Sequence, residues 1–541
     1  MRTRFGGLGV DVVVATTAGD VTAVRASGQT IVLGLPSVLL GALSRDRLPL
    51  APTLIAATDL HLLNADAELV IARLRSSHPS SRVVGFSFSL HDAADMAAFL
   101  GADAEHTYAF PPTARPVPLA TTFDPYTIPH SNALIKAMVA PTYALLRQVD
   151  GASICVVPSR SMCRSVVHDF VTAVGNDDEP DAFLALGSSL DQAAKHIADP
   201  ALADALLQGI AIAHDGQRAA ERRLVLDLFA AGSIRVLVIP REAIWTLPTE
   251  TLRAKLVVVM SAQSVLVDAT TGERELSDYP IADVLRIQSF ARDGGALRIM
   301  CQAEQADMYA RDLTGGIAVE SHLGDAATSS ALVDLVFDDL TAGRIGSLQD
   351  VVDLLSWTYL ARRARSNRTF YAPLVADADG VVVPSADEDV LSRVVDRVVE
   401  RLRRLCCVLS DRVGGLKLTS IGRMLARRGW RPSVLEPVFA TALDDALAVL
   451  RRSPPREGAP TAPDVNAGQL EGFRLRLPRA IKNELGLEDA DLASDEATAV
   501  ERYERVLVGT FLFRRIPPGE EIAAFQALFV ERIVDGLRAG H

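Results

Sequence analysis

The most regular alternation of apolar and polar positions lies in residues 209–248. Residues 210–213 form a short apolar run typical of a buried strand. Residues 219–230 place two leucines and a phenylalanine at helical spacing, opposite charged side chains. Gly232 indicates a helix end, and the apolar run at 234–239 indicates a second buried strand. This order of strand, helix and strand predicts parallel strands joined by a right-handed crossover.

The pattern of apolar and polar positions also divides the rest of the chain into segments. Residues 1–127 alternate short β-branched or apolar runs with helical patterns, which predicts an incomplete α/β domain, and residues 128–322 continue as a second one. Residues 323–385 are mainly helical. Residues 388–409 predict a long helix with valines and leucines on one face and arginines on the other.

The C-terminal part has a different composition. Residues 386–450 are expected to form a helical bundle around the long amphipathic helix. Residues 451–468 hold four prolines and almost no apolar mass, which predicts an extended or disordered linker. Residues 469–541 predict two helices separated by Pro517-Pro518-Gly519.

Composition and charge limit the function classes. The 541 residues suffice for several domains, and 49% hydrophobic with 23% charged residues is an ordinary globular balance. A net charge of −12 argues against a dedicated nucleic-acid binder. The five cysteines form no CxxC pair, so no metal site is predicted, and a reduced intracellular compartment is favoured. No apolar run reaches roughly 18 residues, so no membrane segment is predicted.

Several short motifs in a fixed order carry a resemblance to a known family. They are RPVPL at 115–119, VPSR at 157–160, SDYPIADVL at 277–285, IMCQ at 299–302, VESHL at 319–323 and DLLSWTYLARRARSNRTFY at 353–371. The chain resembles the Ski-like superfamily-two DExH-box RNA helicases, and within them the degenerate C-terminal cassette of the Brr-type spliceosomal helicases that unwind small nuclear RNAs. IMCQ and VESHL favour this kind over the related two-cassette helicases of ribosome quality control.

The resemblance runs from about residue 10 to about residue 537, with 445–470 unmatched, and it implies a domain identity for each part. It implies α/β RecA-like domains followed by winged-helix and helical Sec-type modules. The first RecA-like domain is truncated and lacks its phosphate loop, which in the family lies upstream of the matched region. The implied domains are a truncated RecA-like domain at 1–127, a second one at 128–322, a winged helix at 323–385 and a Sec-type module at 469–541.

ATP hydrolysis in such helicases needs a phosphate-binding GxxxxGK[ST] loop, a metal-binding Asp and a water-orienting Glu. No GxxxxGK[ST] occurs in the chain. The DExH box aligns with Thr58-Asp59-Leu60-His61, where Thr58 replaces the metal-binding Asp and Asp59 replaces the Glu. A threonine hydroxyl is a weak Mg²⁺ ligand beside a carboxylate. The alternative is that Asp59 and His61 only cap and hydrogen-bond the following turn.

Two further family motifs are also altered. The usual Ser-Ala-Thr reads Ser87-Phe88-Ser89, in which Phe88 fits a packed, uncoupled site or ordinary core. In the motif that supplies arginines to the γ-phosphate, Phe290 and Asp293 stand where the family has arginine. Such an arginine is worth roughly 10³–10⁵ in rate, and an acid there would repel the phosphate. We therefore predict no catalytic residue and no cofactor, whereas active relatives use ATP and Mg²⁺.

The candidate RNA contacts are arginines and one tryptophan. Arg115, Arg160 and Trp245 match family positions near the RNA strand, and Arg362 and Arg363 belong to a basic cluster of the kind that holds phosphates. The alternative, which the acidic total favours, is a solvated helix face. Aromatic side chains do not interleave with the arginines, so we expect RNA binding to be weak.

These observations together predict a catalytically inactive helicase cassette, a pseudo-helicase. By resemblance it would be nuclear and serve as a protein-interaction and regulatory platform in pre-mRNA splicing. Its partners would be other spliceosomal proteins or an active helicase cassette. The missing phosphate-loop unit would leave apolar sheet surface that something outside this sequence is expected to cover. The alternatives are a residual ATP-dependent RNA helicase or an RNA-binding module of the same family, including the ribosome-quality-control relative.

Overall fold

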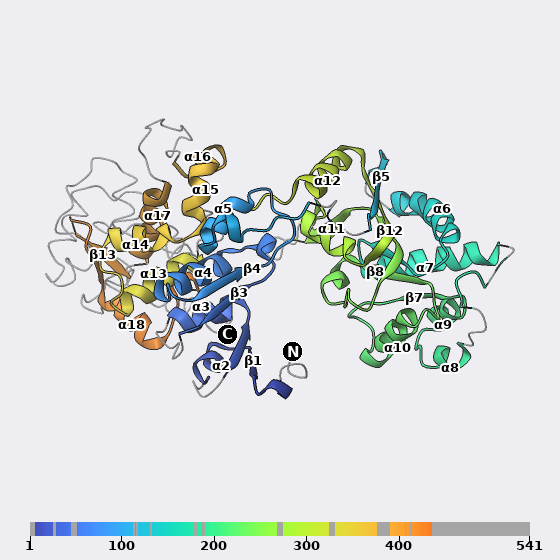
Figure 1. Ribbon diagram of the computed structural model, residues 1–541, viewed down its shortest axis with the longest axis horizontal. Helices are drawn as coiled ribbons and strands as arrows, with labels where there is room; N and C mark the ends of the chain where they lie inside the picture. Colours follow the sequence, from blue (N-terminus) through green and yellow to red (C-terminus); the bar gives the residue numbers. More distant parts are fainter. Residues whose placement is uncertain are drawn as a thin grey trace, which may run out of the picture.

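The computed structural model describes residues 6–24, 29–44, 51–111, 114, 117–129, 132–177, 179, 181–185, 190–267, 274–323, 330–375, 390–405, 407–411 and 413–434. The predicted linker at 451–468, the predicted Sec-type module at 469–541 and the candidate RNA contact Arg115 lie outside these residues. Two lobes are visible in Figure 1, with the largest sheet in one lobe and most of the later helices in the other.

A six-stranded parallel sheet forms the centre of the first of these lobes, which we call the sheet lobe (Figure 1). Its strands follow the order β5-β12-β9-β6-β8-β7, and every neighbouring pair is parallel. Their bounds are β5 (Ala120–Tyr126), β12 (Ala291–Gln302), β9 (Ala254–Met260), β6 (Ser153–Val157), β8 (Val236–Pro240) and β7 (Ile210–Ile212). The parallel α/β sheet predicted for this part of the chain is confirmed. Its edge strand β5 precedes residue 128, where the second domain was expected to begin.

Helices cover both faces of this sheet. Alternate strand residues such as Cys155 and Val157 pack with α6 (Asn132–Gln148) and α7 (Arg160–Gly175) in one buried cluster. Their neighbours Ile154 and Val156 pack on the opposite face with α10 (Ala219–Ala230), α11 (Ile281–Gln288) and α12 (Ala303–Gly315). The short α8 (Asp191–Ala194) and α9 (Pro200–Leu207) precede β7. Period-two burial on both faces is what a doubly wound sheet requires.

The strand, helix and strand predicted in residues 209–248 correspond to β7, α10 and β8. Gly209, which begins this unit, has φ +80°, and a Cβ atom there would collide with the backbone carbonyl of Phe183. Only glycine fits such a close approach in the left-handed region. After β8 the chain forms the 3₁₀ turn η5 (Arg241–Trp245). A hairpin of β10 (Gln263–Val267) and β11 (Arg274–Asp278), which the sequence did not predict, lies between β9 and α11.

The N-terminal strands of the other lobe form two separate parallel pairs within the described residues. β1 (Asp11–Ala15) pairs with β2 (Thr30–Gly34), and β3 (Leu54–Ala57) pairs with β4 (Arg82–Gly85). The helices here are α2 (Ala18–Thr22), α3 (Pro36–Ser44), α4 (Ala65–Ser77) and α5 (Ala93–Leu100), with the short turns η1 (Gly6–Leu8), η2 (Leu60–Leu62) and η3 (Ala104–His106).

Apolar side chains on and after these N-terminal strands remain open to solvent. Val14 is 50%, Leu54 55% and Phe86 58% exposed. A complete α/β sheet would bury such positions. That the first domain is incomplete stays a prediction, and so does what covers this surface.

The later helices share one hydrophobic core with α3 and α4, so we call this part of the molecule the helical lobe. They are α13 (Ser330–Thr341), α14 (Leu348–Ser356), α15 (Tyr359–Ser366), α16 (Arg368–Val375), α17 (Val390–Arg404) and α18 (Ser420–Arg428). The long amphipathic helix predicted at 388–409 is present as α17, with Val394, Val398 and Leu402 in the core. A small antiparallel hairpin, β13 (Val408–Ser410) and β14 (Leu416–Leu418), adjoins it. The winged-helix identity of residues 323–385 stays a prediction.

None of the described helices is long and apolar enough to cross a bilayer.

Candidate functional site

The segment that aligns with the DExH box is a turn at the end of β3. The strand ends at Ala57, and Asp59 has the left-handed backbone angles φ 55° and ψ 43° before η2 begins. The backbone NH of Leu60 donates to the carbonyl oxygen of Phe86 at 3.1 Å, which ties this turn to the end of β4. Thr58 and Asp59 are both exposed, so the two positions that would face Mg²⁺ carry a hydroxyl and one carboxylate.

His61 points into the protein instead of toward a ligand. It is 7% exposed, and its ring lies edge-on against Phe88, with 4.7 Å between the ring centroids. Neither ring nitrogen has a hydrogen-bond partner among the residues that the structure describes, and burial lowers the pKa of the imidazole while the Asp59 carboxylate opposes that shift. Asp59 makes no side-chain capping bond. The alternative that Asp59 and His61 serve only to cap and hydrogen-bond the turn therefore fails.

The Ser87-Phe88-Ser89 segment begins one residue beyond the end of β4, after Phe86. Phe88 packs against the cluster that contains Leu60, Leu63 and Phe99, whereas Ser87 and Ser89 are exposed. The carbonyl oxygen of Ser89 accepts from the backbone NH of Ile317 at 2.8 Å. This contact connects the segment to the chain that leaves the sheet lobe.

Arg286 lies in α11, at the first position of the altered arginine motif. Its guanidinium is bound within its own lobe. Nε donates to the carbonyl oxygen of Ile244 and Nη2 to that of Leu247, both at 2.9 Å. The guanidinium also lies 5.6 Å from the centroid of the Trp245 ring and 5.9 Å from that of Phe290. Arg286 thus fastens η5 to α11 instead of pointing toward a phosphate.

The two lobes face each other at this point. Burial lowers the pKa of Arg286, and the charge of Asp59, from the other lobe, opposes that shift, so the two groups lie within electrostatic range. Phe290 is completely buried in the core of the sheet lobe and presents nothing to a nucleotide. Asp293 falls in β12, and its side chain is outside what the structure describes.

A hydrogen-bonded cluster that sequence reasoning missed surrounds Trp245. Its indole Nε1 donates to Oδ1 of Asp283 at 2.8 Å, and Nε of Arg241 donates to Oδ2 of the same carboxylate at 2.6 Å. Arg241 also donates to Oγ of Ser264 at 2.9 Å. Asp283 lies within the family-like SDYPIADVL stretch, but nothing in the spacing indicated its partners. Trp245 is held by this carboxylate, with 41% of its surface exposed.

Arg160 stands at the start of α7, just after β6, and is exposed. Burial and the charge of Arg160 both lower the pKa of His214, which follows β7. Nδ1 of His214 accepts from the backbone NH of Gly216 at 3.0 Å. Arg160, His214 and Trp245 therefore follow three neighbouring parallel strands at one edge of the sheet, where open α/β sheets bind ligands.

Arg363 is placed differently from its prediction as an RNA contact. It is 4% exposed and bonds to three carboxylates. Nη1 lies 2.6 Å from Asp95, while Nη2 lies 2.6 Å from Glu320 and 2.9 Å from Asp92. A guanidinium so enclosed has no free edge for a phosphate. Its function is to join α15 to α5 and to the segment before α13, so the prediction is wrong for this residue.

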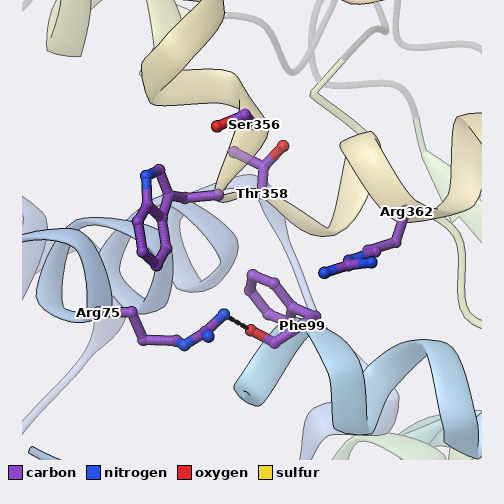
Figure 2. A pocket seen from close by; sticks show the side chains of 6 residues that line it. Arg75, Phe99, Ser356, Thr358 and Arg362 are labelled. Carbon is purple, nitrogen blue, oxygen red and sulfur yellow. Dashed lines mark hydrogen bonds between the residues drawn. The ribbon is translucent and has the colours of Figure 1, made fainter. Parts of the chain in front are cut away.

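The neighbouring Arg362 is exposed and lines a pocket of about 280 Å³ between the lobe's early and late helices. Figure 2 shows Arg362 and Arg75 on either side of Phe99, with Ser356 and Thr358 above them. Trp357 completes the lining and is 40% exposed. Across the described ranges, no three His, Cys, Asp or Glu side chains gather as a metal ion would require.

Comparison with known proteins identifies relatives. No family model matches the chain. The human U5 small nuclear ribonucleoprotein 200 kDa helicase is 30% identical over 372 residues, which cover 66% of this chain. A Dictyostelium discoideum activating signal cointegrator 1 complex subunit 3-like protein is 29% identical over 385 residues, also 66% of this chain. An Arabidopsis thaliana DExH-box ATP-dependent RNA helicase is 32% identical over 337 residues, 59% of this chain.

The matched regions span only 16%, 16% and 15% of these relatives, respectively, so the chain corresponds to a small part of each. Among solved structures, an Escherichia coli DEAH/RHA helicase aligns over 96% of this chain and 53% of its own, at 15% identity and a TM-score of 0.44.

Proposed function

We propose a function from a premise that the comparisons establish: this chain is a relative of the Ski-like DExH-box RNA helicases. The predicted relationship is confirmed. On that premise the chain is a helicase cassette that does not hydrolyse ATP. It corresponds to the C-terminal cassette of the Brr-type helicases and serves as a protein-interaction and regulatory platform in pre-mRNA splicing in the nucleus.

Phe290 and Asp293 stand where the family has its phosphate-facing arginines, so the observation that carries this proposal is the placement of Arg286, an arginine of the same motif that would have to replace them. An arginine that stabilises the transferring phosphate has to present its guanidinium edge to the γ-phosphate oxygens. Arg286 instead donates from Nε and Nη2 to two backbone carbonyl oxygens of its own lobe. Together with Thr58 at the metal-binding position and the buried Phe290, this supports the absence of catalysis.

The role as a platform is supported by the exposed apolar side chains of the helical lobe. Val14, Leu54 and Phe86 lie on or directly after strands whose pairing stops at two members among the described residues. Apolar surface of this kind marks protein interaction sites. The occupant we propose is an active helicase cassette, because the relatives are far longer than the region that this chain matches.

Two kinds of relative match the chain about equally well. Proteins named for the U5 particle and for the signal cointegrator complex match at nearly equal identity, 30% and 29%. The IMCQ and VESHL stretches favour the spliceosomal kind, and we adopt it on that ground.

Two measurements on the full chain test this function. A phosphate-release assay with Mg²⁺ and ATP is expected to give no turnover above a buffer blank. Sedimentation velocity with an active cassette of a spliceosomal relative is expected to show a complex that a Phe86→Ser variant weakens, whereas the matched control Arg365→Ser leaves it unchanged. A complex insensitive to Phe86→Ser, or no complex at all, would contradict the platform role.

A further inference from the structure

The pocket between α4, α5 and the junction of α14 and α15 gathers two arginines without a counter-charge. Its lining is Arg75, Phe99, Ser356, Trp357, Thr358 and Arg362, and it contains no acidic side chain. Neither arginine makes an ion pair with any described residue, although nearby Arg73 pairs with Asp339 and Arg363 pairs with three carboxylates. Two like charges left uncompensated around one cavity are what an anion site requires.

Contacts with the surrounding protein hold Arg75 in position. One guanidinium nitrogen donates to the backbone carbonyl of Phe99, as the dashed line in Figure 2 marks, and the group lies 5.5 Å from the centroid of the Trp357 ring. A guanidinium has five N–H donors, so most of them stay available. Burial lowers the pKa of Arg75, and the charge of Arg362 lowers it further, which places both charges in one electrostatic field.

The remaining walls suit a ring attached to the anion. Phe99, almost fully buried, forms an apolar floor between the two arginines (Figure 2). Trp357 exposes 40% of its surface, and an exposed indole can stack on a planar ring. Ser356 is exposed at the rim, where its hydroxyl donates to the carbonyl oxygen of Asp353 at 2.6 Å. The volume of about 280 Å³ lies just below the usual range for ligand pockets, about 300 to 1,000 Å³.

We propose that this pocket binds a nucleoside monophosphate, with the phosphate between Arg75 and Arg362 and the base against Trp357. The site is separate from the Thr58–Arg286 junction and involves no hydrolysis. Charge-assisted bonds from guanidinium groups are the strong contacts that phosphates make with proteins. The small volume favours a single nucleotide over a longer strand. Ligand binding here would connect α4 and α5 to α15.

The test is calorimetry on the full chain with adenosine 5′-monophosphate, inorganic phosphate, adenosine and a short single-stranded RNA as separate probes. We expect the monophosphate to bind, phosphate to bind more weakly and adenosine to bind least. Arg362→Ala should weaken the monophosphate at least about tenfold, because it removes a charged donor. The matched control Arg365→Ala, on the same helix but outside the pocket, should leave affinity unchanged. Trp357→Leu should weaken the monophosphate but not phosphate.

Each other outcome overturns the proposal in a defined way. No binding of the monophosphate excludes the site. Equal losses in Arg362→Ala and Arg365→Ala indicate general attraction by surface charge. If adenosine binds as tightly as its monophosphate, the phosphate group does not contribute to binding. RNA binding without monophosphate binding identifies a strand contact instead of a nucleotide pocket.

Discussion

Arg286 donates through Nη2 to the carbonyl oxygen of Leu247 at 2.9 Å, and this bond holds the arginine of α11 within its own lobe, near the positions where Phe290 and Asp293 replace the family's arginines. With the parallel bond from Nε to Ile244, it makes Arg286 a structural residue. We predict that Arg286→Ala lowers the free energy of unfolding by about 1–3 kcal/mol, because two carbonyls lose their donor.

Urea denaturation of Arg286→Ala measures this effect. Exposed Arg292→Ala is the matched control and should stay within about 0.5 kcal/mol of the parent. An unchanged midpoint in Arg286→Ala would show that the guanidinium is not needed to hold η5 against α11.

Arg363 leads to a second prediction. It is buried among Asp92, Asp95 and Glu320, so Arg363→Ala leaves three carboxylates near each other without their cation. Removing one partner from a buried ionic cluster costs about 3–5 kcal/mol. Denaturation in guanidinium chloride should show that loss of unfolding free energy in Arg363→Ala and almost none in the neighbouring Arg362→Ala. Similar losses in both variants would mean that the basic cluster acts as one solvated face, the interpretation that the structure rejects for Arg363.

Glu68 predicts a dependence of stability on pH. Burial raises the pKa of this carboxyl from 4.5 to about 7, although it accepts from Oγ of Ser321 at 2.7 Å and from the backbone NH of Leu360 at 2.8 Å. The folded carboxyl therefore holds a proton that the unfolded chain releases above about pH 4.5. Stability falls as the pH rises from about 4.5 to about 7, by up to roughly 3 kcal/mol.

Glu68→Gln removes that titration. We expect the free energy of unfolding of the variant to rise relative to that of the parent between pH 4.5 and 7. Above pH 7 the difference should stay constant, as measured by urea midpoints at each pH. The exposed Glu105→Gln should follow the parent throughout. Parallel curves for Glu68→Gln and the parent would show that the buried carboxyl does not titrate in this window.

His61 predicts a contribution of opposite sign. Burial lowers its pKa below 6.5, so the unfolded chain binds a proton that the folded protein resists. The stability due to neutral His61 is present above about pH 6.5 and is lost as the pH falls through the lowered value. His61→Leu keeps the apolar contact with Phe88 and removes two unpartnered nitrogens. It should be neutral or stabilising at pH 8 and should lose less stability than the parent at pH 5. Equal losses at pH 5 would refute this.

The sequence predicted the sheet better than the side-chain contacts. The unit of β7, α10 and β8 follows from local periodicity, and the amphipathic pattern of α17 does likewise. The hairpin of β10 and β11 was missed because its residues mix polar and apolar types, and the buried Gln263 and Ser264 are polar while Val265 and Leu276 are exposed. The short strands of residues 1–127 were expected, but their division into two pairs depends on contacts that no local pattern records.

Contacts between distant residues explain the errors in the site. Arg363 belongs to a run of arginines that suggests a phosphate-binding surface, yet its partner Asp95 is 268 positions away. Trp245 was noted as a candidate RNA contact, but its bond to Asp283 spans 38 positions. The pairing of Arg75 with Arg362 around one pocket likewise arises only when α4 packs beside α15. Residue type indicated the chemistry of these groups, and only the fold identified their partners.

The most direct test of the central claim is a phosphate-release assay on the purified full chain with Mg²⁺, ATP and saturating single-stranded RNA. The account predicts release at the rate of a buffer blank, with no change in Asp59→Asn or Arg286→Ala. RNA-stimulated release in the parent that Asp59→Asn abolishes would contradict it. That result would mean that the turn after β3 and the arginine of α11 still form a working nucleotide site.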